Sequence, residues 1–263
     1  MFKHRRKLLS QNFLKDRRLI KKLIRSSGIG GNDTVLEIGV GKGIITEGLL
    51  SVSRKVIGVE VDQAWFDLVS GRLGDNKDLK LIWGDFLDFE LPKEPYKVFA
   101  NIPFSITGEI IKKLLFSDNP PDTCNLIVQK EAAEKLVANK GKSNMLAILF
   151  YPWFDIKIVH IFQGTEFKPT PSVTACLLRI TKRPGPFVSW ENSGKYRDLV
   201  VDQFTKRRSA SRWPASQWLD RYLKYTRGQG SFAKWQAEQK RVNKIHRTRT
   251  DKNWKMYINK FPG

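Results

Sequence analysis

The sequence predicts an α/β protein with a mostly parallel sheet, followed by a small, mainly α-helical module. Short apolar runs alternate with longer mixed segments between residues 34 and 130, a rhythm typical of βαβ units. Several of these runs end in glycine or polar residues, as do strands that border a ligand site. Past RPGP (183–186), aliphatic runs become rare while basic residues and tryptophans accumulate. We therefore expect two domains, 1–182 and 183–263.

The individual elements follow from the hydrophobic pattern along the chain. Residues 17–29 place Leu19, Ile20, Leu23 and Ile24 on one face, which predicts a helix. We expect buried strands at 34–39, 55–61, 79–85, 96–102 and 124–130, and intervening helices at 45–52, 64–73 and 108–116. The segment 145–181 contains further apolar runs separated by Pro-rich turns, which predicts later strands, with antiparallel pairing as one option.

Composition narrows the class of protein. A chain of 263 residues that is 41% hydrophobic is long enough to bury a substantial core. Its two cysteines, Cys124 and Cys176, lie far apart without neighbours at metal-ligand spacing, so we expect neither a disulfide scaffold nor a metal site. The basic N-terminus has no apolar core of a signal peptide, and the longest apolar run, 145–154, is too short to span a bilayer. We expect a cytoplasmic protein that has no membrane partner.

The net charge of +21 is unevenly distributed. Residues 1–30 carry a net charge of +9, residues 31–180 a net charge of −2, and residues 181–263 a net charge of +14. A solvated surface usually mixes both signs, so basic ends on either side of a neutral middle favour a polyanionic partner. Nucleic acid is the partner we expect, because each neutralised phosphate releases counterions. We expect tryptophans in the C-terminal module to form its core more often than to stack on bases.

Polar residues follow three consecutive predicted strands. The first strand runs into Gly39-Val40-Gly41-Lys42-Gly43, a turn that lets backbone approach a ligand beside a helix N-terminus. Glu60 ends the next strand, 19 residues beyond Gly41, where a carboxylate can accept hydrogen bonds from ribose hydroxyls. Asp85 ends the third, where it could bind an adenine amino group. Any one of these features alone also fits a tight turn or a solvent-exposed polar residue without a function. Together they predict a site for an adenosine-bearing cofactor.

The fourth strand ends in Asn101-Ile102-Pro103-Phe104. An asparagine–proline turn can be purely structural, but here it follows a strand that ends in the same expected crevice. The amide oxygen of Asn101 and the carbonyl of Ile102 could accept the two N–H bonds of an exocyclic adenine amine. Phe104 could then stack on a base that has left its own stack. Catalysis at such a site depends on orientation and dipoles rather than on a strong base.

With these motifs in place, the chain resembles the erythromycin-resistance (Erm) branch of the rRNA adenine dimethyltransferases. The resemblance spans almost all of residues 10–180, in QNFL (11–14), VLEIGVGKG (35–43), GVEVD (58–62), GDFLDF (84–89), NIPFSIT (101–107), LIVQKEAAEKL (126–136) and FKPTPSVTACLLRI (167–180). It implies a Rossmann-like class I methyltransferase domain that uses S-adenosylmethionine. The acceptor would be the N6 atom of one adenine in 23S rRNA before full ribosome assembly. Such methylation blocks macrolide, lincosamide and streptogramin B antibiotics, and the protein would be a monomer.

The resemblance also implies roles for individual residues. Cofactor contacts are expected at Gln11, Asn12, Leu14, Gly39, Gly41, Glu60, Val61, Asp85, Phe86 and Asn101. The target adenine is expected at Asn101, Ile102 and Phe104, with Phe167 as a second wall. The family most often has tyrosine at the position of Phe104, so stacking is retained and a hydroxyl is lost. We expect RNA contacts at Lys3, Arg5, Arg6, Lys7, Lys206, Arg207 and Arg208, although the match beyond residue 181 is loose.

Two alternatives remain open from the sequence. The related dimethyltransferase that modifies 16S rRNA during ribosome biogenesis shares an Asn-x-Pro-aromatic motif and QNFL. The short, basic C-terminal part and the segment between residues 136 and 167 favour the Erm branch. A non-catalytic RNA-binding or assembly factor could retain the fold, but it would not need Glu60, Asp85 and Asn101 together.

Overall fold

The computed structural model describes residues 12–137, 144–206 and 213–226. By their contacts, these residues group into two compact units. The first comprises residues up to 115, 119–134 and 157–182, and the second comprises 116–118, 135–156 and the residues from 183 onward. One break between the units lies at 182/183, where the sequence predicts a boundary. The division into two contiguous domains stays a prediction.

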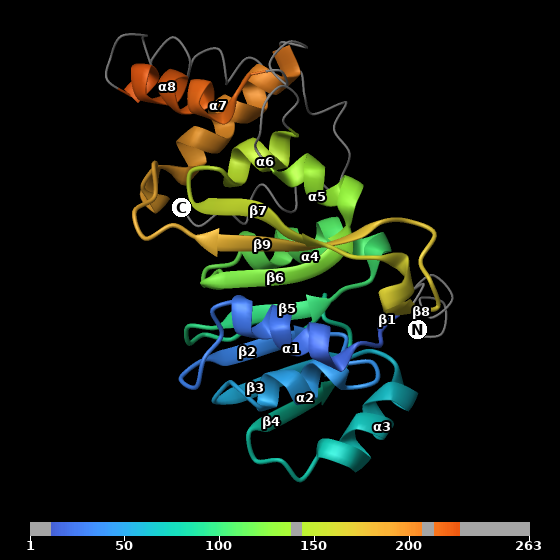
Figure 1. Ribbon diagram of the computed structural model, residues 1–263. Helices are drawn as coiled ribbons and strands as arrows, with labels where there is room; N and C mark the ends of the chain where they lie inside the picture. The colour runs from blue at the N-terminus through green and yellow to red at the C-terminus, as the bar shows by residue number, and fades with distance from the viewer. Residues whose placement is uncertain (1–11, 138–143, 207–212, 227–263) are drawn as a thin grey trace. The chain divides into compact units, whose positions relative to one another are not determined.

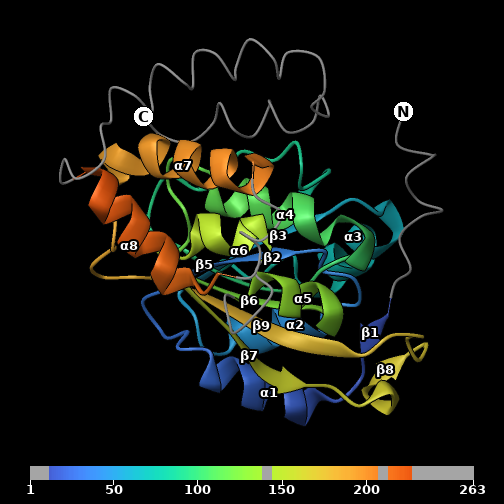
Figure 2. The same cartoon turned by 90° about the horizontal axis from the view of Figure 1, so that it is seen from above.

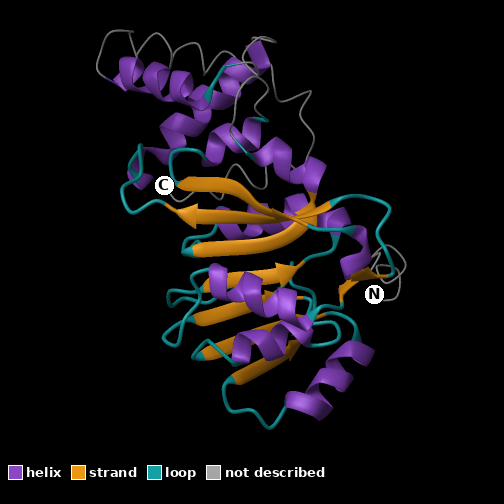
Figure 3. Ribbon diagram, in the orientation of Figure 1, coloured by secondary structure: helices purple, strands orange, loops and turns teal. Residues whose placement is uncertain are grey.

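The α/β prediction is confirmed by a seven-stranded sheet in the order β4-β3-β2-β5-β6-β9-β7 (Figures 1 and 3). Its parallel strands are β2 (Thr34–Ile38), β3 (Lys55–Glu60), β4 (Leu79–Trp83), β5 (Lys97–Asn101) and β6 (Thr123–Gln129). The later strands are β7 (Phe154–Ile161) and β9 (Ala175–Lys182), and β9 pairs with β6 antiparallel. The expected late antiparallel pairing is therefore present.

The order of the parallel strands reverses at β2. This strand pairs with β3 on one side and with β5 on the other, although β5 comes two strands later in the chain. The carboxyl ends of β2 and β5 therefore lie side by side with no connection crossing between them. Open α/β sheets bind their ligands at such a switch point.

Four helices lie where the sequence predicts them: α1 (Arg17–Ser26), α2 (Ile44–Leu50), α3 (Gln63–Leu73) and α4 (Thr107–Leu115). A further helix, α5 (Lys130–Leu136), follows β6. Helices α1 and α2 cover one face of the sheet, and α4 covers the other (Figures 1 and 2). Asp16 caps α1 by accepting hydrogen bonds from the backbone N–H groups of Arg18 and Leu19, at 2.8 and 3.1 Å.

The core under α1 is continuous with the sheet. Ile20, Leu23 and Ile24 on this helix are buried and pack in one cluster with Val35 of β2, Phe99 of β5, and further apolar residues from β6 and β9. Their spacing is the one that predicts an amphipathic helix. The basic residues of α1 therefore lie on its solvent face.

The sequence did not predict three features. Residues 145–150 form the helix α6 (Met145–Phe150) rather than a strand. Short strands β1 (Phe13–Leu14) and β8 (Phe167–Lys168) pair antiparallel in a separate two-stranded sheet. The helix α5 was not predicted as a helix, although its residues belong to the segment LIVQKEAAEKL that carries the family resemblance. A run that is apolar on all sides carries no period, which is why α6 could not be distinguished from a strand.

The second unit includes α6, the short helix η5 (Trp190–Asn192), α7 (Ser193–Lys206) and α8 (Ala215–Thr226). Trp218 on α8 is fully buried and stacks on Phe204, with ring centroids 5.0 Å apart. For Trp218, this confirms the expectation that tryptophans of the C-terminal module form its core. No helix among the described residues has the length and apolar character that crossing a bilayer would require.

Glu37, in the middle of β2, is fully buried, and neither of its carboxyl oxygens has a hydrogen-bond partner among the described residues. Burial raises the pKa of Glu37 well above its ordinary value; the neighbouring Thr46 opposes this rise, and the nearby Glu60 adds to it. The folded protein therefore holds this proton more tightly than the unfolded chain does. Its contribution to stability is present at low pH and is lost as pH rises through the folded pKa.

Replacing Glu37 with the uncharged Gln should remove this pH dependence. We expect the free energy of unfolding of Glu37→Gln to exceed that of wild type increasingly from about pH 5 to about pH 8, by on the order of 1–3 kcal/mol. Urea unfolding at several pH values measures this difference. The same substitution at exposed Glu109 on α4 is the matched control. Parallel pH profiles for Glu37→Gln and wild type would show that the carboxyl is not protonated in the fold.

Candidate active site

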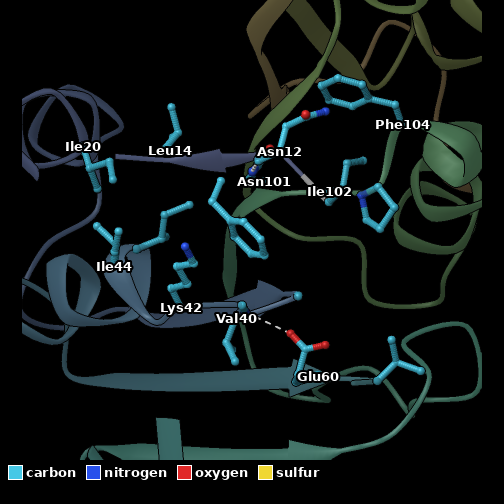
Figure 4. Close-up of a pocket in the computed structure, with 16 residues that line it drawn as sticks. Asn12, Leu14, Ile20, Val40, Lys42, Ile44, Glu60, Asn101, Ile102 and Phe104 are labelled. Carbon is cyan, nitrogen blue, oxygen red and sulfur yellow. Dashed lines mark hydrogen bonds between the residues drawn. The ribbon is translucent and has the colours of Figure 1, made fainter. Parts of the chain in front are cut away.

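A pocket opens at the carboxyl ends of β2, β3 and β5, within the first unit (Figure 4). Residues from β1, α1, the glycine loop, the start of α2, the ends of β3 and β5, and the loop after β5 line it: Asn12, Phe13, Leu14, Ile20, Gly39, Val40, Gly41, Lys42, Ile44, Ile45, Glu60, Val61, Asn101, Ile102, Pro103 and Phe104. Nine of these were expected from the sequence as site residues: Asn12, Leu14, Gly39, Gly41, Glu60, Val61, Asn101, Ile102 and Phe104. The pocket thus brings together residues spread over about ninety positions of the chain.

The glycine loop forms one wall of the pocket. Gly39, Gly41 and Gly43 have φ angles of 74°, 50° and 75°, in the left-handed region that side chains with a Cβ disfavour. A Cβ on Gly41 would lie 2.7 Å from the Cε1 atom of Phe13. The loop is thus shaped so that bare backbone faces the pocket, as a ligand that packs closely against it requires.

Arg72, on α3, supports the glycine loop from outside the pocket. Its Nη2 atom donates a hydrogen bond to the carbonyl oxygen of Lys42 at 2.7 Å and forms an ion pair with Glu47 at 2.9 Å. Glu47 also pairs with Arg17. These contacts tie the loop to α2, α3 and α1, so its conformation is set from three sides.

Glu60 is 3% exposed and lies at the end of β3. One carboxyl oxygen accepts the N–H of Gly41 at 2.9 Å, and the other accepts the N–H of Asp62 at 2.8 Å. Burial raises the pKa of Glu60, while the bonds from the Asp62 and Gly41 backbone oppose the rise. Each carboxylate oxygen has a second lone pair, so both can still accept a bond from a ligand hydroxyl.

Asn101 is the last residue of β5. Its Nδ2 group donates to the carbonyl oxygen of Asn12 at 2.7 Å (Figure 4). This bond fixes the side-chain amide, and the Oδ1 atom has no hydrogen-bond partner among residues in the described ranges. An oriented acceptor at the edge of the pocket is what binding an amine N–H requires.

The residues after Asn101 form a rigid turn. Ile102 is buried, and Pro103, at φ −60°, precedes the short helix η3 (Phe104–Ile106). The hydroxyl of Thr107 donates to the Phe104 carbonyl oxygen at 3.1 Å. Phe104 is half-buried and packs against the core cluster while also lining the pocket. Figure 4 shows it on the side of the pocket opposite to Ile20 and Ile44.

Three of the expected site residues that the structure describes do not line this pocket: Asp85, Phe86 and Phe167. Asp85 accepts the backbone N–H of Leu87 at 2.9 Å, and Phe86 is buried, with its ring centroid 6.4 Å from that of Phe89. Phe167 is 2% exposed and packs edge-to-face on Phe162, so its role as a second wall stays a prediction. Gln11 lies outside the described residues.

The expected RNA contacts are also largely outside the described chain. This holds for Lys3, Arg5, Arg6, Lys7, Arg207 and Arg208, while Lys206 is the last residue of α7. In the described ranges, no cluster of three or more His, Cys, Asp or Glu side chains has the arrangement of a metal site.

Lys42 and Phe13 are pocket residues that sequence reasoning did not assign. The Nζ atom of Lys42 lies 5.0 Å from the ring centroid of Phe13 and 5.9 Å from that of Trp65. Both Lys42 and Phe13 belong to motifs already recognised, GVGKG and QNFL. A lysine inside a glycine loop is a signal that could have indicated Lys42. The direction of its side chain, however, depends on aromatic rings from distant segments of the chain.

Comparison with known proteins identifies the family. The family model for ribosomal RNA adenine dimethylases matches residues 1–212. An rRNA adenine N-6-methyltransferase of Bacteroides fragilis is 35% identical over 188 residues, which cover 71% of this chain and 70% of that protein. A ribosomal RNA small subunit methyltransferase A of Acaryochloris marina is 34% identical over 193 residues, covering 69% of this chain and 72% of that protein.

A solved structure gives the same result for the fold. The crystal structure of the 23S rRNA methyltransferase ErmE superposes with a TM-score of 0.73 at 24% identity, over 81% of this chain and 99% of that one. The Rossmann-like class I methyltransferase fold expected from the sequence is therefore confirmed. The chain belongs to the ribosomal RNA adenine dimethylase family and is an S-adenosylmethionine-dependent rRNA adenine methyltransferase.

Proposed function

We propose that this enzyme methylates N6 of a specific adenine in 23S rRNA before full ribosome assembly and so confers resistance to macrolide, lincosamide and streptogramin B antibiotics. In this proposal it acts in the cytoplasm as a monomer. Catalysis rests on one observation: the amide of Asn101 is held by Asn12 with its oxygen unpartnered at the pocket. The 23S assignment is supported by the motifs shared with the Erm branch and by the fold shared with ErmE.

The pocket has features that fit S-adenosylmethionine. The bare backbone of Gly39 and Gly41 provides close approach, and Glu60 retains acceptor capacity for ribose hydroxyls. Asn12 and Leu14 would complete the binding of the methionine end. When bound, the cofactor supplies an electrophilic methyl group on a sulfonium. We retain Asp85 and Phe86 as proposed contacts to the adenine ring of the cofactor. In this conformation, the side chain of Asp85 accepts a hydrogen bond from the backbone N–H of Leu87 in the same turn.

The residues after β5 would act on the acceptor adenine. Oδ1 of Asn101 and the Ile102 carbonyl would accept hydrogen bonds from the amine N–H groups, which directs the nitrogen lone pair away from the ring plane. Phe104 would stack on the base and hold it in one orientation. This chemistry depends on positioning and on fixed dipoles, so it needs no strongly basic side chain. The proton released after methyl transfer would pass to solvent.

A second candidate is methylation of 16S rRNA. It is favoured by the Acaryochloris marina small-subunit relative, whose identity of 34% is close to the 35% of the Bacteroides fragilis protein. Both candidates use the same pocket, so the rRNA species must be determined directly.

The experiment is methyl transfer to deproteinised 16S and 23S rRNA, each supplied alone, followed by mass spectrometry of nuclease fragments. We expect N6-methylated adenine at a single position of 23S rRNA and no modification of 16S rRNA. Cells that express the protein should also tolerate macrolides, and an Asn101→Ala variant should not protect them. Methylation confined to 16S rRNA would contradict the 23S assignment while leaving the enzyme class intact.

A further inference from the structure

Helix α1 presents a row of basic side chains beside the active-site pocket. Five of its ten residues are basic and none is acidic: Arg17, Arg18, Lys21, Lys22 and Arg25. They follow the helical spacing i, i+1, i+4, i+5 and i+8, which places them along one side of the helix. All five are exposed. We call this set the α1 basic stripe.

The charges of the α1 basic stripe are mostly unneutralised. Arg17 pairs with Glu47. Arg18, Lys21, Lys22 and Arg25 have no ion pair among the residues that the structure describes. Arg–Lys pairs four residues apart, such as Arg18–Lys22 and Lys21–Arg25, repel one another, at a cost of a few tenths of a kcal/mol per pair. Residues 31–180 as a whole carry a net charge of −2, so the stripe is not part of a generally basic domain.

The stripe begins at the pocket. Asn12 and Leu14, just before α1, line the pocket, and so does Ile20 on the buried side of the helix. Figure 4 shows Leu14 and Ile20 together at one side of this pocket. Phe104 lies on the opposite side of the pocket from Ile20 (Figure 4). RNA that presents a base beside Phe104 and leaves the pocket along α1 would pass Arg17 and Arg18 first and then the rest of the stripe.

The burial of the apolar side of α1 distinguishes between two possible partners of the α1 basic stripe, an anionic membrane and a nucleic acid. A basic amphipathic helix can bind an anionic membrane by inserting its apolar face. Here that face is occupied, because Ile20 is 1%, Leu23 5% and Ile24 0% exposed within the core. Only the charged side is available, which suits a phosphate backbone rather than a bilayer.

We propose that the α1 basic stripe binds the phosphate backbone of the rRNA next to the target adenine. This inference rests on the proposed function for the presence of RNA at the pocket, but it does not depend on which subunit supplies the RNA. The stripe would position the substrate through contacts that carry no sequence information. The α1 basic stripe would be an RNA-binding surface in addition to the basic residues near both ends of the chain that the sequence predicts to contact RNA.

The test is the triple variant Arg18→Gln/Lys21→Gln/Lys22→Gln in the full chain. Glutamine is a good helix former, and removal of the repelling Arg18–Lys22 pair does not weaken α1. The matched control, Lys55→Gln/Lys77→Gln/Lys80→Gln, removes three exposed cations at the amino ends of β3 and β4. Those strand ends lie at the edge of the sheet opposite to the pocket.

Dissociation constants for deproteinised 23S and 16S rRNA are measured over a range of salt concentrations for wild type and both variants. We expect the α1 variant to bind the rRNA that wild type methylates about tenfold more weakly or worse near 0.1 M salt. Its log–log salt slope should fall by about two, since each phosphate contact contributes roughly 0.7–0.9. The control should change affinity less than about twofold, and both variants should bind S-adenosylmethionine as wild type does.

Equal RNA affinities and salt slopes for the two variants would overturn the proposal. So would an α1 variant that binds RNA normally but no longer binds phosphatidylglycerol vesicles that wild type binds, because the stripe would then serve a membrane surface. If wild type methylates 16S rather than 23S rRNA, the 23S assignment fails. The comparison of variants on 16S rRNA still decides the role of α1.

Discussion

Replacing Asn101 with alanine is expected to lower the rate of methyl transfer by a hundredfold or more, equivalent to a few kcal/mol of barrier. The reason is geometric. The Nδ2 group of Asn101 is bound to the Asn12 carbonyl at 2.7 Å, so Oδ1 is held ready for the incoming amine. Alanine removes the acceptor and the bond that orients it. The loss of rate is measured by single-turnover kinetics on the unmodified rRNA species that the wild-type enzyme methylates.

Measuring rRNA affinity and the rate of the chemical step separately distinguishes a catalytic role of Asn101 from a structural one. We expect Asn101→Ala to retain most affinity for the rRNA while losing the rate of the chemical step. Asn76→Ala is the matched control, because Asn76 accepts the Asp78 N–H at 2.9 Å in the turn between α3 and β4. Full turnover by Asn101→Ala would refute the assigned role.

The second large effect is expected at Phe104. Phe104→Ala should reduce kcat/KM for rRNA by about tenfold to a hundredfold, because stacking on an extruded base contributes on the order of 1–3 kcal/mol. Phe104→Tyr should stay within about threefold of wild type, since it keeps the ring. Steady-state kinetics with rRNA as the varied substrate provide the comparison.

Phe104 also packs against the core cluster, so loss of stability must be distinguished from loss of stacking. Phe104→Leu serves this purpose, because it retains apolar volume but has no aromatic face. We expect it to unfold near the wild-type denaturant midpoint while transferring methyl groups as poorly as Phe104→Ala. If the leucine and tyrosine variants are equally active, the ring has no stacking role.

Most of the fold of residues 34–130 could be predicted, because buried parallel strands and amphipathic helices carry strong periodic signals. Strands β2 to β6 appear within a few residues of their predicted limits. The helix α6 and the pair β1–β8 were missed for different reasons. The first is apolar on all sides, and the second has only two residues per strand, too few for any pattern.

The site was predicted where backbone topology alone positions a residue. Glu60 and Asn101 end parallel strands, so their meeting at one pocket follows from the sheet. Asp85 differs, because its carboxylate can bond to the N–H of Leu87 two residues on, a local alternative that strand order does not reveal. The contact between Phe167 and Phe162 depends on a chain path that no sequence pattern shows.

We expect S-adenosylmethionine to bind in the pocket between the glycine loop, Glu60 and Asn101. Gly41→Ala and Gly71→Ala make the same chemical change in two environments. At Gly41, with φ 50°, the new Cβ would lie 2.7 Å from Phe13, whereas at Gly71 on α3 it would meet nothing within 4 Å. Both variants are compared with wild type by titration calorimetry. We expect cofactor affinity to fall at least about tenfold in Gly41→Ala, since left-handed strain of about 1–2 kcal/mol adds to the steric conflict, and to be unchanged in Gly71→Ala. Equal affinities in the two variants would place the cofactor elsewhere and contradict the account.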